Sequence, residues 1–145
     1  MNELLQNPQL NIPVVNGSAF IPSDFRIGNY VQSKEWKGIA QIEGIEVLQD
    51  RIDFKVKGYI HAVIKGKYFD LEPIKITDEL LFSLGFYTDG KFRIYVSGNF
   101  EFRLRLNSIT GEYMCDFPNW IFSVKYLHRL QNLIHNLSGR DVVLS

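Results

Sequence analysis

The sequence predicts an α+β protein in which an N-terminal SH3-like small β-barrel is followed by a helix, a three-stranded antiparallel meander and a C-terminal helix. Three observations support this fold class. Short strand-like segments separated by glycines fill residues 25–72. A clear β-hairpin pattern covers residues 91–107, and two amphipathic stretches with capping signals flank it. We therefore predict an extended arm at 1–24, the barrel at 25–72, and an α-β-β-β-α subdomain at 73–145 that shares one core with the barrel.

The predicted arm differs in composition from the rest of the chain. It contains Pro8, Pro13 and Pro22, two acidic residues and no basic one. Proline fixes φ and removes an amide donor, which favours an extended segment over a helix or a central strand. Apolar residues such as Leu10 and Phe20 indicate that the arm is packed. It lies either along its own domain or on another subunit.

The predicted barrel consists of four or five short strands without a helix. Its clearest strand covers residues 51–57, where Ile52, Phe54 and Val56 alternate with Asp53, Lys55 and Lys57. Alternation with a period of two is typical of a strand with one buried face.

Capping residues set the limits of both predicted helices. Thr77 is placed as the N-cap of a two-turn helix that ends at Gly85. Ser123 is placed as the cap of a helix over residues 124–137, which ends before Gly139. We expect a short final strand at 141–144.

The hairpin is predicted to turn at Gly98-Asn99, with a third strand at 112–117. Apolar and polar residues alternate on both of its arms, which predicts one buried face. We expect Arg93, Arg103 and Arg105 to lie together on the polar face, where Glu101 interrupts them.

Composition excludes several classes of protein. The chain has 145 residues, 46% of them hydrophobic and 14% aromatic, which is too apolar for a disordered protein and long enough for a single domain. No apolar run reaches the roughly 20 residues that cross a bilayer. The 16 basic and 16 acidic residues balance, which argues against a strongly cationic nucleic-acid binder. The N-terminus lacks the features of a signal peptide and Cys115 is the only cysteine, so we expect a cytoplasmic location.

No residue pattern predicts catalysis, a cofactor or a metal site. His128 and His135 are seven residues apart on the last helix, which places them about 10 Å apart along its axis, too far to share a metal ion. His61 has no second ligand near it in sequence, and a lone Cys115 within a strand is typical of a small core residue. We therefore expect that the protein is not an enzyme.

Two groups of residues are candidate binding surfaces. The first is free of acidic residues and has the composition of a surface that contacts phosphates and stacks on bases; it comprises Lys55, Lys57, Tyr59, Lys65, Lys67 and Tyr68. Exposed lysines on a strand also prevent edge-to-edge aggregation, which is the alternative interpretation. The second is the polar side of the last helix, with His128, Gln131 and Asn132. It either binds a partner or is simply solvated.

Three motifs, in order, resemble a family of small proteins encoded by phages and prophage-like mobile elements of gut anaerobes. The first is Phe25-Arg26-Ile27-Gly28-Asn29-Tyr30-Val31, which is similar to the family's "LRIGN-(Y/L)-V" opening. The segment from Leu71 to Phe86 resembles "L-x-PI-x-LTEEWLLKFGF", and the segment from Val124 to Asp141 resembles "IKYVHQLQNLYFALTG-(E/K)-(E/D)-L". Leu80 stands where the family tends to have Trp, and residues 1–24 extend beyond the usual start.

The resemblance implies a phage or mobile-element origin and a location in the bacterial host cell. The family has no assigned activity and no catalytic residues to transfer. We therefore expect a non-enzymatic accessory protein that binds a host-defence component, a virion component or, through residues 1–24, a second copy of itself. The alternative is a single-stranded nucleic-acid-binding module that uses the lysine and tyrosine surface.

Overall fold

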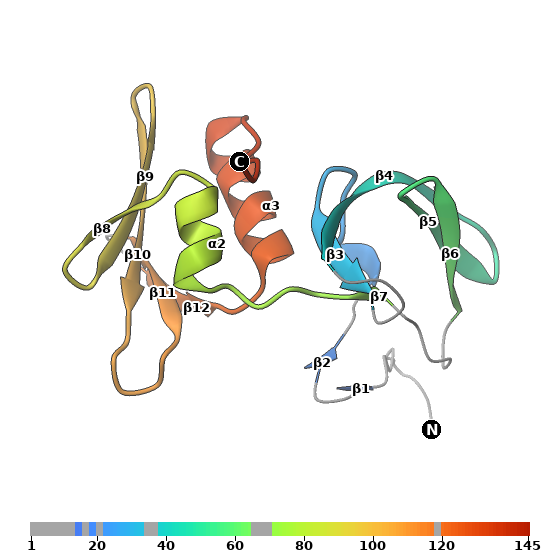
Figure 1. The fold of residues 1–145 in the computed structure, drawn as a ribbon, viewed down its shortest axis with the longest axis horizontal. Helices are drawn as coiled ribbons and strands as arrows, with labels where there is room; N and C mark the ends of the chain where they lie inside the picture. Colours follow the sequence, from blue (N-terminus) through green and yellow to red (C-terminus); the bar gives the residue numbers. More distant parts are fainter. Residues whose placement is uncertain (1–13, 16–17, 20–21, 34–37, 65–70, 118–119) are drawn as a thin grey trace. The chain divides into compact units, whose positions relative to one another are not determined.

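The computed structural model describes residues 14–15, 18–19, 22–33, 38–64, 71–117 and 120–145, and the chain forms two compact units (Figure 1). The first unit comprises residues 1–74 and the second residues 75–145. Each is described by itself. Most of the predicted arm lies outside the described residues; its described part contains a short antiparallel pair, β1 (Val14–Val15) with β2 (Ser18–Ala19), and the 3-10 turn η1 (Pro22–Asp24).

The main element of the first unit is a five-stranded antiparallel sheet with the strand order β6-β5-β4-β3-β7. Its strands are β3 (Tyr30–Ser33), β4 (Ile39–Val47), β5 (Arg51–Val56), β6 (Tyr59–Ile64) and β7 (Leu71–Glu72). Phe54 and Val56 of β5 are buried and Lys55 is exposed, which confirms the predicted alternation. Phe54 contacts Phe25 edge to face, with 6.3 Å between the ring centroids. The other buried members of this core are Val31, Ile42, Val63 and Leu71.

The predicted SH3-like barrel is wrong. Among the described residues no ladder joins β6 to β7, so the sheet is open and these two strands are its edges. β7 has only two residues, and both are paired with β3. Barrel closure requires a continuous ladder around the sheet, and a two-residue strand paired on one side does not supply it.

The turn before β3 explains the first motif in structural terms. Gly28 has a φ of 96°, a conformation that favours glycine. The buried Asn29 closes the turn, because its Oδ1 accepts a hydrogen bond of 2.7 Å from the backbone N–H of Arg26. Its carbonyl accepts one of 2.8 Å from Ile42 of β4. The motif thus fixes the entry of the chain into the sheet.

The second unit is a five-stranded antiparallel sheet with the order β12-β11-β10-β9-β8 and two helices on one face (Figure 1). The strands are β8 (Tyr87–Asp89), β9 (Phe92–Ser97), β10 (Phe100–Leu106), β11 (Tyr113–Phe117) and β12 (Trp120–Val124). The helices are α2 (Asp78–Ser83) and α3 (Leu127–Ser138). The core of this unit is formed by buried apolar residues of the covered face and of the helices, among them Leu81, Phe102, Leu104, Cys115, Leu127, Leu130 and Ile134.

The predicted three-stranded meander is also wrong, because β8 and β12 extend it at both edges. The sequence predicts Ser123 as the cap of the last helix, but Ser123 lies in β12 opposite Met114. α3 begins instead at Leu127, after Tyr126 as the N-cap. A serine before an amphipathic stretch is a frequent cap, and here the pairing of β12 with β11 overrides that local preference.

The other predicted helix limits are confirmed. Thr77 caps α2, with its Oγ1 accepting a hydrogen bond of 3.2 Å from the backbone N–H of Leu80. Gly85 and Gly139 follow the two helices with φ values of 102° and 74°. The expected final strand at 141–144 is absent from the described structure. That segment instead buries Val142, and the backbone N–H of Ser145 donates to the carbonyl of Ser83 at 2.9 Å.

Candidate binding surface

The described lysines and tyrosine of the first candidate surface do not share one face of their sheet. In the β5–β6 pair, Lys55 lies opposite Ile60, and Val56 lies opposite Tyr59. The side chain of Val56 is buried in the core. Since successive side chains of a strand point to opposite faces, Lys55 and Tyr59 project on opposite sides of the sheet. Lys57 lies in the turn between β5 and β6, with a φ of 53°. Lys65, Lys67 and Tyr68 lie outside the described residues.

The polar residues of the last helix are largely covered. His128 and Gln131 are 2% and 4% exposed, and Asn132 is half-buried. The three therefore do not form an exposed polar face. Burial of His128, helped by the charge of the neighbouring Arg129, lowers the pKa of its imidazole to about 3. His128 is thus neutral at physiological pH.

Because His128 is buried in its neutral form, we expect the free energy of unfolding to fall in mild acid. Below the ordinary His pKa of 6.5 the unfolded chain takes up a proton that the folded protein accepts only near pH 3. Stability should therefore fall as the pH drops from about 6.5 towards 3, with a slope approaching about 1.4 kcal/mol per pH unit. Urea unfolding at several pH values measures it, and His128→Gln should have a flatter profile between pH 6.5 and 4. Equal slopes for both proteins would contradict the assignment.

The predicted arginine patch is split between the two faces of the second sheet. Arg93 of β9 is opposite Leu104 of β10, whereas Arg103 and Arg105 are opposite Ile94 and Phe92. Arg93 therefore points to the face that the helices cover, and it is buried there. The expectation that Arg93 lies with the other two arginines is wrong.

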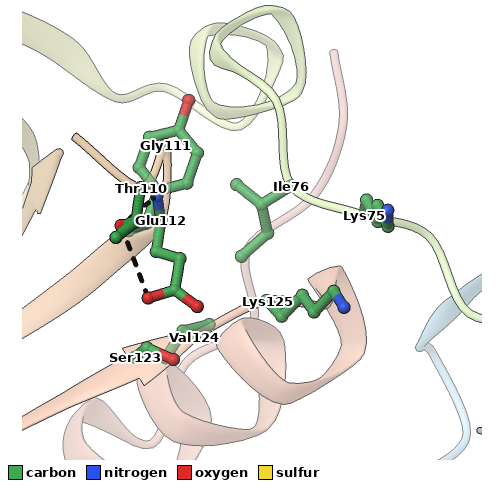
Figure 2. Close-up of a pocket in the computed structure, with 9 residues that line it drawn as sticks. Lys75, Ile76, Thr110, Gly111, Glu112, Ser123, Val124 and Lys125 are labelled. Carbon is green, nitrogen blue, oxygen red and sulfur yellow. Dashed lines mark hydrogen bonds between the residues drawn. The ribbon is translucent and has the colours of Figure 1, made fainter. Parts of the chain in front are cut away.

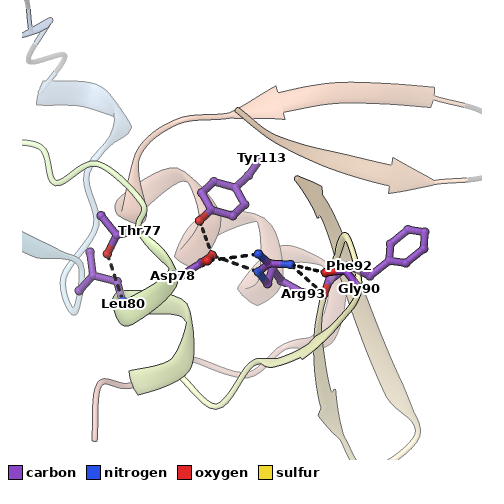
Figure 3. Close-up of polar contacts among 7 residues, drawn as sticks. All are labelled: Thr77, Asp78, Leu80, Gly90, Phe92, Arg93 and Tyr113. Atoms are coloured by element: carbon purple, nitrogen blue, oxygen red, sulfur yellow. Dashed lines mark hydrogen bonds and ion pairs between the residues drawn. The ribbon is translucent and has the colours of Figure 1, made fainter. Parts of the chain in front are cut away.

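Arg93 forms a structural cluster with the first residue of α2 (Figure 3). Its Nε and Nη2 donate to the two carboxylate oxygens of Asp78 at 3.0 and 3.1 Å. Nη1 donates to the carbonyl of Gly90 at 2.9 Å, and the hydroxyl of Tyr113 donates to Asp78 at 2.5 Å. The hydrogen bonds from Arg93 and then from Tyr113 hold the pKa of the Asp78 carboxyl below its usual range. The cluster joins α2 to strands β9 and β11.

A cavity of about 310 Å³ lies beside Tyr113, at the turn between β10 and β11 (Figure 2). Lys75, Glu112, Ser123 and Lys125 contribute to its lining. The Thr110 hydroxyl donates to Glu112 Oε1 at 3.5 Å, and the backbone N–H of Glu112 donates to Thr110 Oγ1. Both side chains therefore take part in hydrogen bonds within the turn.

Cys115 does not supply a nucleophile. It is fully buried between β10 and β12, and burial raises the pKa of its thiol to about 12. A thiol with this pKa stays protonated at neutral pH, whereas nucleophilic attack requires the thiolate. Cys115 acts as a small core residue.

The open face of the second sheet is a better candidate for binding. We use this name for the face opposite the helices, where strand pairing groups apolar and aromatic side chains around Arg103 and Arg105. Three of these side chains are about half exposed: Tyr87 (51%), Val96 (50%) and Ile121 (53%). The remaining apolar members are Phe92 and Met114, which are partly buried, and Ile94, which is buried.

The two arginines of the open face lie on its central strand, β10. The Arg103 guanidinium lies over the Phe92 ring at 4.7 Å, and its Nε is 3.9 Å from Glu101. Arg105 lies between Phe92 and Met114, and its buried Nε has no hydrogen-bond acceptor among the described residues. Because this Nε is buried, it is not a donor that a bound molecule can reach.

The alternation within each strand does not predict the open face, but the turn between β9 and β10 does. The signal was the two-residue turn at Gly98-Asn99, which pairs Ser97 with Phe100 and therefore fixes the pairing of every residue along the hairpin.

Comparisons with protein-family models, with curated proteins and with solved structures found no match. Within the described part of the chain, no helix is long and apolar enough to cross a membrane. The same residues contain no cluster of three His, Cys, Asp or Glu side chains placed to hold a metal ion.

Proposed function

We propose that this protein is a non-enzymatic accessory protein of a phage or mobile element that binds another protein through the open face of its second sheet. The phage or mobile-element origin rests on the three sequence motifs, which also suggest the cytoplasm of a bacterial host as the place of action. A host-defence or virion component is the kind of partner that this origin suggests.

The observation that carries the proposal is the composition of the open face. Tyrosine, phenylalanine, methionine and arginine are the residues enriched at the centres of protein interfaces. Five of these residues lie on one side of a sheet whose other side is covered by two helices: Tyr87, Phe92, Met114, Arg103 and Arg105. Arginines and aromatic residues in such positions often supply most of the binding energy.

Charge favours a protein over a nucleic acid as the partner. Arg103 and Arg105 share the open face with Glu101, Asp116 and the exposed Asp89. These carboxylates would repel a phosphate backbone, whose binding depends on an excess of basic groups. A protein surface that combines apolar side chains with a few carboxylates or carbonyls matches the open face more closely.

A pair of matched tyrosine variants tests this proposal. Tyr87 is on the open face and Tyr59, which is 73% exposed, is on the first unit. We expect Tyr87→Ala to weaken the affinity for the captured partner about tenfold or more, as for the loss of an aromatic hot spot, and Tyr59→Ala to leave it nearly unchanged. The measurement is affinity capture from infected host cells, followed by titration with the purified partner.

Two results would contradict the proposal. An equal affinity of the Tyr87→Ala and wild-type proteins would exclude the open face. Absence of a protein partner, together with binding to a labelled single-stranded oligonucleotide that weakens steeply above about 50 mM salt, would favour the nucleic-acid alternative.

A further inference from the structure

Within the described part of the chain, β6 is an edge strand, and its own sequence lacks the features that usually prevent pairing with another strand. Its six residues, Tyr59–Ile64, include no charged residue, no proline and no glycine. Natural edge strands are commonly blunted by charged side chains, prolines, bulges or short length. By comparison β7 has two residues and β8 has three, including Asp89. Next to the end of the edge strand β12, the backbone N–H of Ile76 donates to the carbonyl of Lys125, the residue that follows the strand.

The register of the β5–β6 hairpin identifies the backbone groups that point outward. A two-residue turn, Lys57-Gly58, with both φ values positive (53° and 80°), joins Val56 to Tyr59. Such a turn makes Val56 and Tyr59 a hydrogen-bonded pair, and these pairs alternate along the ladder. The N–H and C=O groups of Ile60, Ala62 and Ile64 therefore point away from β5, and no described residue pairs with them.

The side chains of these same three residues are exposed. Ile60 is 61% exposed, and Ala62 and Ile64 are also in contact with solvent. They lie on the face of the sheet opposite the Phe54 core, beside Lys55, Asp53 and Arg51 of β5. An apolar row at the very edge of the sheet is thus bordered by charged residues, as in an interface with an apolar centre and a polar rim.

We propose that β6 pairs antiparallel with β6 of a second copy of this chain, about a two-fold axis at Ala62. Ile60 and Ile64 are equally distant from Ala62 in sequence. A two-fold axis there places Ile60 opposite Ile64 of the second copy and Ala62 opposite its own counterpart. The outward backbone groups of β6 then form hydrogen-bonded pairs across the axis. The small Ala62 lies at the centre, where the two strands approach, and each isoleucine packs against an isoleucine.

The outer edge of β6 is complementary to itself, which favours a second copy of this chain as its pairing partner. The row Ile60, Ala62, Ile64 is the same when it is read in either direction. β6 contains no Asp, Glu, Lys or Arg, so the pairing brings no like charges of these residues together within the strand. This surface is separate from the open face, and the inference does not depend on the proposed function.

Complementary charges at Ala62 provide the test. The full-length wild type should sediment as a dimer of 16.8 kDa chains at concentrations of about 100 µM and dissociate on dilution. Ala62→Lys and Ala62→Glu should each be monomeric, because each places like charges directly opposite one another. An equimolar mixture of the two variants should recover the dimer, which a variant that fails to fold could not do. Ile109→Lys, at an exposed turn residue of the second unit, is the control and should behave as the wild type.

Each remaining outcome would overturn the proposal. A monomeric wild type at about 100 µM would exclude the β6 dimer. A dimer that persists in both Ala62 variants would place the interface elsewhere. Loss of the dimer in both variants without recovery in the mixture would show that Ala62 does not face its own counterpart.

Discussion

Replacing Asp78 by asparagine is expected to lower the free energy of unfolding of the second unit by about 2 kcal/mol. The substitution removes the charge that neutralises the buried Arg93 and weakens the acceptor of the Tyr113 hydroxyl. Removing one partner of a fully buried ion pair costs about 3–5 kcal/mol. The Asp78 side chain is half exposed, so water compensates for part of the loss. Urea denaturation at neutral pH measures the change.

Glu79→Gln is the matched control for Asp78→Asn. Glu79 is the neighbouring acidic residue in the first turn of α2 and is exposed. Both substitutions remove one charge from the helix N-terminus, where a carboxylate contributes about 0.3–1 kcal/mol. Only Asp78→Asn removes the partner of Arg93. Equal destabilisation by both variants would mean that the ion pair contributes nothing beyond the helix dipole.

The Asp78 contribution also has a defined pH window. Its carboxyl pKa is lowered in the folded protein, so its stabilisation is present above the ordinary value of 3.8 and is lost as the pH falls through the lower folded value. The loss of stability expected from His128 begins near pH 6.5 and thus precedes it. The two groups can therefore be separated by titration.

Replacing Phe54 by alanine is expected to destabilise the first unit by about 3–5 kcal/mol. Phe54 is fully buried at the centre of the core formed with Phe25, Val31 and Ile42. Its removal forfeits the transfer free energy of the ring and leaves a cavity that the sheet cannot fill completely. Amide hydrogen exchange at Val31 and Ile42 should accelerate, because both residues lie in the same core.

Phe82→Ala is the matched control for Phe54→Ala, since Phe82 of α2 is 78% exposed. We expect a change within about 0.5 kcal/mol there, as for most surface substitutions. A small effect at Phe54, or a large one at Phe82, would contradict the core assignment.

Local patterns predicted the structure well where local interactions determine it. Thr77 caps α2 because its hydroxyl satisfies a backbone N–H of the first turn, and Gly139 ends α3 because it adopts a positive φ. The alternation along β5 correctly identified its buried face. Barrel closure failed as a prediction because it depends on pairing between strands distant in sequence, which no local pattern specifies.

The error about the faces of the β9–β10 hairpin was avoidable. The alternation within each strand, taken separately, predicts that the apolar residues of both strands share one buried face. The two-residue turn pairs Ser97 with Phe100. Even-numbered residues of β9 therefore lie on the same side of the sheet as odd-numbered residues of β10. Phe92 thus shares a face with Arg105, and Arg93 shares one with Leu104. The same reasoning at Lys57-Gly58 separates Lys55 from Tyr59.

The burial of His128 could not be predicted from the sequence. In the helical pattern His128 lies at the border of the apolar stripe that begins at Leu127. A small rotation of α3 about its axis buries or exposes His128, and the stripe faces the sheet in both cases. The packing of α3 in this structure turns His128 and Gln131 inward along with Leu130 and Ile134. Tertiary packing, rather than the pattern, decided their exposure.

Site-specific photo-cross-linking tests the central claim, that the open face binds a protein partner, most directly. A benzophenone amino acid is introduced in place of Val96, on the open face, and separately in place of Ile109, which is 93% exposed in the turn after β10. We predict that irradiation in the presence of the captured partner gives a covalent adduct from position 96 and none from position 109. An adduct from position 109 alone, or none from position 96 while the partner is bound, would contradict the claim.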